Sequence, residues 1–86
     1  MKSDKGIRSS SDIGPILRSL RIQNKLTQND LSKSTGIKQQ TISAIENGLQ
    51  NPELNTLFAI LSYLNLELVV RAREQRTHGF APGRSK

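Results

Sequence analysis

The segment TQNDLSKSTGIKQQTISAIENG, residues 27–48, constrains the fold of this chain more than any other part. It contains two short helical patterns of apolar residues, which a turn around Gly36 separates. Thr27 and Asp30 have the spacing of a capping box, so they predict the start of the first helix. A left-handed backbone at Gly36, where a Cβ would clash, explains how that helix ends. The segment therefore predicts two helices joined at a fixed, steep angle.

The second helix of this pair is predicted over about residues 38–47, with Gly48 ending it. Because Ile42 and Ile45 point toward the core with Ile37, the polar start of the helix is directed outward. Glutamine amides there can bond to adenine, a threonine methyl can touch thymine, and a lysine can reach guanine or a phosphate. The residues expected to contact DNA bases are Lys38, Gln39, Gln40, Thr41 and Ala44.

Residues around this helix are suited to the DNA backbone. Gln28, at the start of the preceding helix, is placed for a phosphate, and the N-terminal amides of that helix favour an anion. The residues expected to contact phosphates are Lys25, Thr27, Gln28, Ser43 and Asn47. Glu46 is expected to form a structural bond within the motif. An isolated pair of glutamines would be ordinary solvated residues, so the helix–turn–helix frame is what favours DNA contact.

Two further helices flank the motif. The first begins at Ser11 or Asp12 and carries an apolar stripe, with three basic residues predicted to lie off it. The stripe is Ile13, Ile16, Leu17 and Leu20, and the basic residues are Arg18, Arg21 and Lys25. The last helix is predicted to be capped by Asn55 and to stop near Asn65. Its apolar stripe is Leu57, Phe58, Leu61 and Leu64.

A two-residue alternation over residues 66–73 predicts a strand. A lone strand has unpaired edges, and antiparallel pairing with the same strand of a second copy satisfies both chains. We therefore expect a homodimer, with a frayed extension of the preceding helix as the alternative. The expected dimer contacts are Leu66, Leu68, Val69, Val70 and Ala72. Residues 1–11 are expected to form a flexible basic arm, 12–74 the folded domain and 75–86 a disordered tail.

Composition favours an anionic partner and argues against catalysis. The net charge is +6 and the pI about 10.4, which points to nucleic acid first and an anionic membrane second. The chain has no cysteine, and its one histidine, His78, lies in the polar tail. No carboxylate pair, nucleophile–base arrangement or metal-ligand spacing is present. We therefore expect no enzymatic activity and no cofactor.

The segment 27–48 resembles the helix–turn–helix of the XRE or lambdoid-repressor family, whose pattern is TQ-x-x-LA-x-x-x-G-[VI]-x-x-x-x-[IV]-S-x-x-E-x-G. Ser32 replaces the usual alanine, a change from one small residue to another. The matching residues are Thr27, Gln28, Leu31, Gly36, Ile37, Ile42, Ser43, Glu46 and Gly48. The resemblance covers about residues 12–72 and implies an all-α, four- to five-helix lambda-repressor-like DNA-binding domain, here followed by the predicted strand.

Within that family, the strand predicted directly after the last helix makes this chain similar to HipB-type antitoxins. The resemblance implies a repressor that binds a palindromic operator in its own operon and neutralises a HipA-like serine/threonine kinase toxin. A free-standing prophage or metabolic regulator is the alternative, and an interaction adaptor without DNA binding is a third possibility, which the glutamines and the charge disfavour. No apolar run approaches the roughly 20 residues of a membrane span, and residues 1–11 lack the apolar centre of a signal peptide, so a cytoplasmic location is expected.

Overall fold

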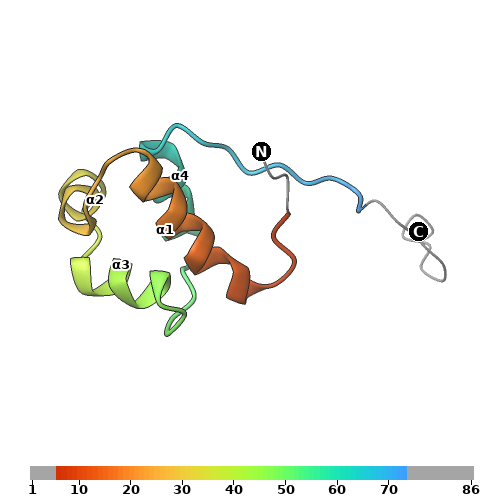
Figure 1. Cartoon of the computed structure of the whole chain (residues 1–86), viewed down its shortest axis with the longest axis horizontal. Coiled ribbons are helices and arrows are strands. Elements are labelled where there is room, and N and C mark those ends of the chain that lie inside the picture. Colours follow the sequence, from red (N-terminus) through yellow and green to blue (C-terminus); the bar gives the residue numbers. More distant parts are fainter. Residues whose placement is uncertain (1–5, 74–86) are drawn as a thin grey trace.

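The computed structural model describes residues 6–73, which form four α-helices preceded by a single 3-10 turn (Figure 1). The predictions for residues 1–5 and for the tail, 75–86, lie outside this range. The end of the predicted arm belongs to the turn, η1. The elements are η1 Ser10–Asp12, α1 Ile13–Gln23, α2 Gln28–Thr35, α3 Gln39–Glu46 and α4 Leu54–Tyr63. The all-α class predicted from the sequence is confirmed.

The core is a cluster of aliphatic side chains to which all four helices contribute. Its buried members are Leu17, Leu31, Ile42, Ile45, Leu57, Ile60, Leu61 and Leu64, and Ile13, Leu20, Leu26 and Ile37 pack against them. The predicted stripe of α4 was wrong in one member, because Phe58 is 48% exposed while Ile60 is 1% exposed. The buried face of α4 follows the spacing i, i+3, i+4 and i+7 from Leu57, and Phe58 lies outside it.

The start of α4 also differs from the prediction. Glu53, and not Asn55, is the N-cap residue, and its side chain makes no capping hydrogen bond. The backbone N–H of Leu57 donates to the Glu53 carbonyl at 2.9 Å, so the helical bonding begins two residues before Asn55. Asn55 therefore lies inside the first turn of the helix.

Three of the helices end in the same way, with a residue of positive φ followed by a leucine. The φ angles are 61° at Lys25 after α1, 78° at Gly48 after α3 and 61° at Asn65 after α4. The amide of the next residue then bonds to the carbonyl five positions back: Leu26 to Arg21 at 3.2 Å, Leu49 to Ala44 at 2.8 Å and Leu66 to Leu61 at 2.8 Å. This is the Schellman arrangement, which fixes the following leucine relative to the last turn of its helix.

The segment after α4, residues 66–73, leaves the helices and runs outward (Figure 1). No strand is present in residues 6–73 of this single copy, so the predicted strand is not formed within one chain. The alternative of a helical extension is not observed either. Helix α4 ends at Tyr63, and Asn65 has a left-handed backbone conformation, with φ 61°.

Helices α1 and α3 approach closely at Gly14, which is buried. A Cβ at this position would lie 2.2 Å from the Ile45 carbonyl oxygen and 3.1 Å from that of Glu46. Only glycine lets the two helices come so near, because both obstacles are backbone atoms. The sequence analysis did not identify this position.

Residues 6–73 contain neither a membrane-spanning helix nor a cluster of metal ligands. No helix there is long and apolar enough to span a membrane. Nor does that part of the chain gather three or more His, Cys, Asp or Glu residues in a way that could hold a metal ion.

Candidate nucleic-acid interface

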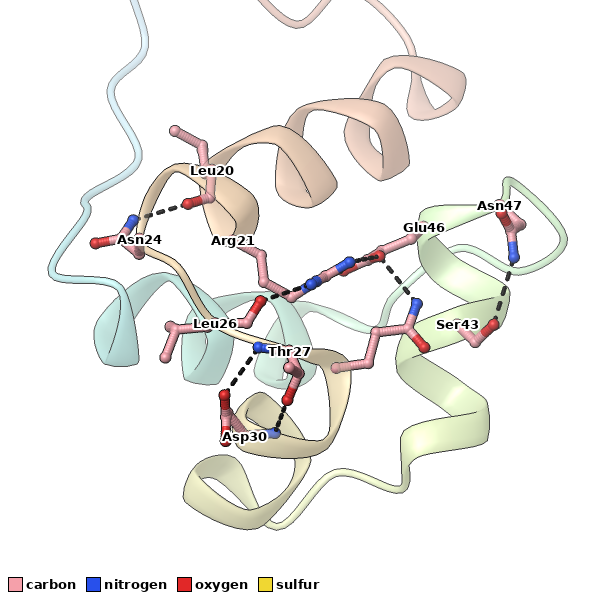
Figure 2. Close-up of polar contacts among 10 residues, drawn as sticks. Leu20, Arg21, Asn24, Leu26, Thr27, Asp30, Ser43, Glu46 and Asn47 are labelled. Carbon is pink, nitrogen blue, oxygen red and sulfur yellow. Dashed lines mark hydrogen bonds and ion pairs between the residues drawn. The ribbon is translucent and has the colours of Figure 1, made fainter.

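The helix–turn–helix begins with a capping box at Thr27 and Asp30, as predicted. The Thr27 hydroxyl oxygen accepts the Asp30 N–H at 2.9 Å, and the Asp30 carboxylate accepts the Thr27 N–H at 2.9 Å (Figure 2). The bond from the Thr27 backbone keeps the pKa of the Asp30 carboxyl below its ordinary value. The first turn of α2 therefore starts at a defined residue, with an ionised carboxylate beside its N-terminus.

The turn between α2 and α3 is closed by backbone and side-chain bonds. Gly36 has φ +81° and donates its N–H to the Ser32 carbonyl at 2.9 Å, which confirms the predicted left-handed helix end. The Ser32 hydroxyl donates to the Ile37 carbonyl. The Thr35 hydroxyl donates to the Leu31 carbonyl at 2.7 Å and accepts the Ile37 N–H at 3.2 Å. These bonds fix the direction in which α3 leaves the turn.

A buried ion pair joins the far end of α3 to α1. Arg21 donates from Nε to Glu46 Oε2 at 2.7 Å and from Nη2 to Oε1 at 3.0 Å, a bidentate arrangement (Figure 2). Arg21 also donates from Nη1 to the Leu26 carbonyl at 2.7 Å, and Gln28 donates from Nε2 to Glu46 Oε1 at 3.0 Å. The structural role predicted for Glu46 is confirmed. The prediction that Arg21 lies off the buried face was wrong, because only 8% of this residue is exposed.

Both members of this pair are charged at neutral pH. Burial raises the pKa of the Glu46 carboxyl, but the hydrogen bonds from Arg21 and Gln28 and the positive charge of Arg21 lower it by more, so the net shift is downward. The hydrogen bond to Glu46 raises the pKa of Arg21. One carboxylate thus ties α3 to both α1 and α2, and it fixes α3 at the end opposite to the turn.

With both ends fixed, α3 presents the polar residues predicted to contact bases. Lys38 is the N-cap residue of α3, and it is exposed together with Gln39 and Gln40. Thr41 and Ala44 are half-buried. An open depression of about 420 Å³ lies on this surface, lined by Gln28, Gln39, Gln40, Ser43, Ala44 and Leu49. The fold thereby brings together residues predicted for bases and for phosphates, and adds Leu49, which the sequence analysis did not select.

Several of the residues predicted to contact phosphates already have partners within the chain. The Thr27 hydroxyl caps α2, and the Gln28 amide donates to Glu46. The Asn47 amide donates to the Ser43 hydroxyl at 3.3 Å. Lys25 is exposed in the turn after α1. Their contacts with DNA stay predictions.

The residues predicted for the dimer line a second, larger groove. Leu66, Leu68, Val69, Val70 and Ala72 are exposed in the single chain. Together with apolar residues of α1 and α4 they border a groove of about 920 Å³, whose walls include Ile13, Ile16, Leu20, Leu57 and Leu61. Residues 66–73 and the neighbouring faces of α1 and α4 therefore border one groove, whose lining is mostly apolar and also includes Arg8, Glu67, Arg71 and Arg73.

Comparison with known proteins adds independent findings. The model of the helix-turn-helix family HTH_3 matches residues 17–70. Antitoxin HipB of Escherichia coli (strain K12) is 40% identical over 70 residues, which are 81% of this chain and 80% of that protein. An uncharacterized HTH-type transcriptional regulator of Methanocaldococcus jannaschii is 38% identical over 52 residues, which are 60% of this chain and 79% of that protein. A chain of a solved HipA–HipB–O2–O3 complex superposes with a TM-score of 0.73 at 37% identity and covers 83% of this chain and 100% of its own.

Proposed function

We propose that this chain, which belongs to the helix-turn-helix family HTH_3, is a sequence-specific DNA-binding repressor that reads the major groove with α3. The observation that carries the proposal is the fixed position of α3 between the turn at Gly36 and the Arg21–Glu46 ion pair, with its amide-bearing face exposed. The position of α3 must be fixed because base edges are distinguished by the geometry of their hydrogen-bond donors and acceptors.

The proposed base contacts come from the first half of α3. Gln39 and Gln40 each offer an amide that can bond to N6 and N7 of adenine at once. Lys38 lies at the start of the helix, where it can reach guanine O6 and N7 or a phosphate. Thr41 and Ala44 supply methyl groups for apolar contact.

The proposed backbone contacts surround that helix and come from Lys25, Thr27, Gln28, Ser43 and Asn47. Gln28 shows how a residue with a hydrogen-bond partner inside the chain can still contact a phosphate. Its amide nitrogen has two N–H donors, and only one of them is needed for the bond to Glu46. The second can donate to a phosphate oxygen beside the N-terminus of α2, where the helix dipole also favours an anion.

Replacing Gln39 or Gln40 with alanine should weaken binding to the preferred duplex by about 1–3 kcal/mol, because each change removes one bidentate base contact. The preferred duplex is first selected from a random pool, and affinities are then measured for single base-pair variants. Each mutant should lose discrimination at one position of the half-site. Gln50→Ala is the matched control, since Gln50 is exposed but does not line the depression beside α3. Unchanged discrimination in both mutants would contradict the assigned roles.

We further propose that two copies pair through residues 66–73 as an antiparallel strand pair, with Leu66, Leu68, Val69, Val70 and Ala72 at the contact. The apolar groove beside α1 and α4 supports this arrangement, since a second copy would cover it. Pairing of two such segments would also form backbone hydrogen bonds between the copies, as in any antiparallel strand pair. A two-fold dimer places its recognition helices about 34 Å apart, one turn of DNA, and so requires a palindromic operator.

Val70→Asp should raise the dimer dissociation constant at least about tenfold, because a charge would be placed at the strand contact in both copies. Val70 is 93% exposed in the single chain, so the change should leave the monomer folded. Sedimentation over a range of concentrations gives the dissociation constant, and circular dichroism checks the fold. Leu54→Asp, a charge at an exposed apolar residue of α4 outside the groove, is the control. A Val70 variant that remains as dimeric as this control would exclude the proposed strand contact.

The antitoxin role is proposed from the HipB relatives, one of which was solved in a complex with HipA. On this proposal the dimer represses its own operon and neutralises a HipA-like serine/threonine kinase toxin. The relative described as a transcriptional regulator favours a second candidate, a free-standing regulator without a toxin. Co-expression with the neighbouring gene tests the choice. Co-purification of a kinase-like protein with this chain supports the antitoxin, and its absence favours the free-standing regulator.

A further inference from the structure

The loop that follows α3 carries a leucine that the core does not use. Leu49 is 81% exposed, whereas the buried aliphatic residues of the four helices are at most 8% exposed. A scattered exposed leucine is common on protein surfaces. Leu49 is distinguished by its place, because it lines the depression beside α3 together with Gln39 and Gln40.

The backbone fixes Leu49 in that place. Gly48 N–H donates to the Ile45 carbonyl at 3.1 Å and Leu49 N–H donates to the Ala44 carbonyl at 2.8 Å, which are the two bonds of the Schellman arrangement. The leucine of such an arrangement commonly packs against the residue whose carbonyl it bonds, which here is Ala44. A single methyl group cannot cover a leucine side chain, so this local contact leaves most of Leu49 open.

The same arrangement at the other helices gives an internal comparison. After α1, Leu26 is half-buried and packs against the core. After α4, Leu66 is 36% exposed, against 81% for Leu49. Helix capping alone therefore does not account for a leucine as exposed as Leu49, which lines the depression that contains the proposed base-reading amides.

The chemistry of this depression matches the edge of an A·T base pair. Gln39 and Gln40 supply amides for adenine. Ala44 follows Gln40 by four residues, so it lies on the same face one turn further along α3, and Leu49 extends the apolar area beyond it. Thymine carries a methyl group at C5 in the major groove, and cytosine does not. A small apolar area beside adenine-binding amides therefore suits a thymine near the adenine that a glutamine binds.

We propose that Leu49, with Ala44, contacts the C5 methyl group of a thymine in each half-site and so determines part of the base preference. This inference rests on the proposed DNA binding by α3 and names a residue and a base that the motif does not assign. The lining of the depression is otherwise amide and hydroxyl groups, which fits a base edge better than the apolar surface of another protein.

Deoxyuridine substitution tests the proposal, because uracil differs from thymine only by the missing methyl group. In the duplex selected by the full-length protein, each thymidine pair related by the two-fold axis is replaced in turn. With the original protein, one position should lose about fourfold in affinity per half-site, the equivalent of one buried methyl group. Leu49→Ala should bind the unmodified duplex more weakly by a similar factor and should lose most of the discrimination between thymine and uracil at that position, with Ala44 supplying what remains.

Leu54→Ala is the matched control, since it removes the same atoms from an exposed leucine that does not line the depression. It should keep the uracil profile of the original protein, and thermal unfolding should show all three proteins equally folded. A Leu49→Ala protein with an unchanged uracil profile overturns the inference, including the case in which it loses only dimer or toxin binding. If the Leu49→Ala protein still loses its preference for adenine when Gln39 is also replaced, the proposed function stands, but without a role for Leu49. Failure of the original protein to select any duplex would instead refute the proposed function itself.

Discussion

Glu46→Ala is expected to destabilise the fold by about 3–5 kcal/mol, because it leaves the Arg21 guanidinium buried without its partner. The side chains of Arg21 and Glu46 are 10% and 2% exposed, so the guanidinium depends on the carboxylate and not on bulk water for its compensation. Small domains are stable by only about 5–15 kcal/mol, so the loss is a large share of the total. Urea unfolding followed by circular dichroism measures it.

A double variant separates the effect of the unpaired buried charge from the effect of lost side-chain volume. Arg21→Met with Glu46→Leu removes both charges and keeps apolar bulk, and replacement of a buried ion pair in this way is often close to neutral. The double variant should therefore be more stable than Glu46→Ala. If Glu46→Ala lost less than about 1 kcal/mol, the pair would behave like an exposed one and the argument from burial would fail.

The pH dependence of stability measures the same interaction. Since the pKa of Glu46 is lowered in the folded state, its contribution is present above the unfolded value of about 4.3 and is lost as the pH falls through the lower folded value. The original protein should lose more stability between pH 7 and pH 3 than the Glu46→Ala variant does. Equal losses would show that this carboxyl is not linked to folding.

The sequence was a good guide to the elements whose residues act locally. The capping box at Thr27 and Asp30, the left-handed end at Gly36 and the inward-facing Ile42 and Ile45 depend on neighbours within a few positions, and all were predicted correctly. Periodicity placed α4 but misassigned Phe58, because two overlapping stripes fit the same apolar run. Only the packing against the other helices decides between them.

The long-range contacts were harder to predict. Arg21 follows Leu17 by four residues and therefore lies on the buried face of α1, but a charged residue is ordinarily assigned to solvent. Its partner Glu46 is 25 positions away in the sequence. Local spacing does not reveal that pairing. The structural bond expected of Glu46 was nevertheless a reason to look for a basic partner. Leu49 was not selected, because nothing in its neighbouring sequence marks it as part of the surface beside α3.

Gly14→Ala is expected to cost about 3 kcal/mol, near the upper end for overpacking of a buried site. In an open helix the same change would be favourable by about 1 kcal/mol, because alanine has the better helix propensity. Here the new Cβ would lie 2.2 Å from the Ile45 carbonyl oxygen, a backbone atom that no rotamer change can move. Helices α1 and α3 must therefore separate, which also strains the nearby Arg21–Glu46 pair.

Ser19→Ala, at an exposed position of the same helix, is the control and should change stability by no more than about 0.5 kcal/mol. Chemical unfolding of both variants gives the difference. Because α3 carries the proposed base contacts, Gly14→Ala should also weaken binding to the selected duplex under conditions where the protein is still folded. A Gly14→Ala protein as stable as the control would mean that the two helices can separate at little cost, and the close approach would then not be what positions α3.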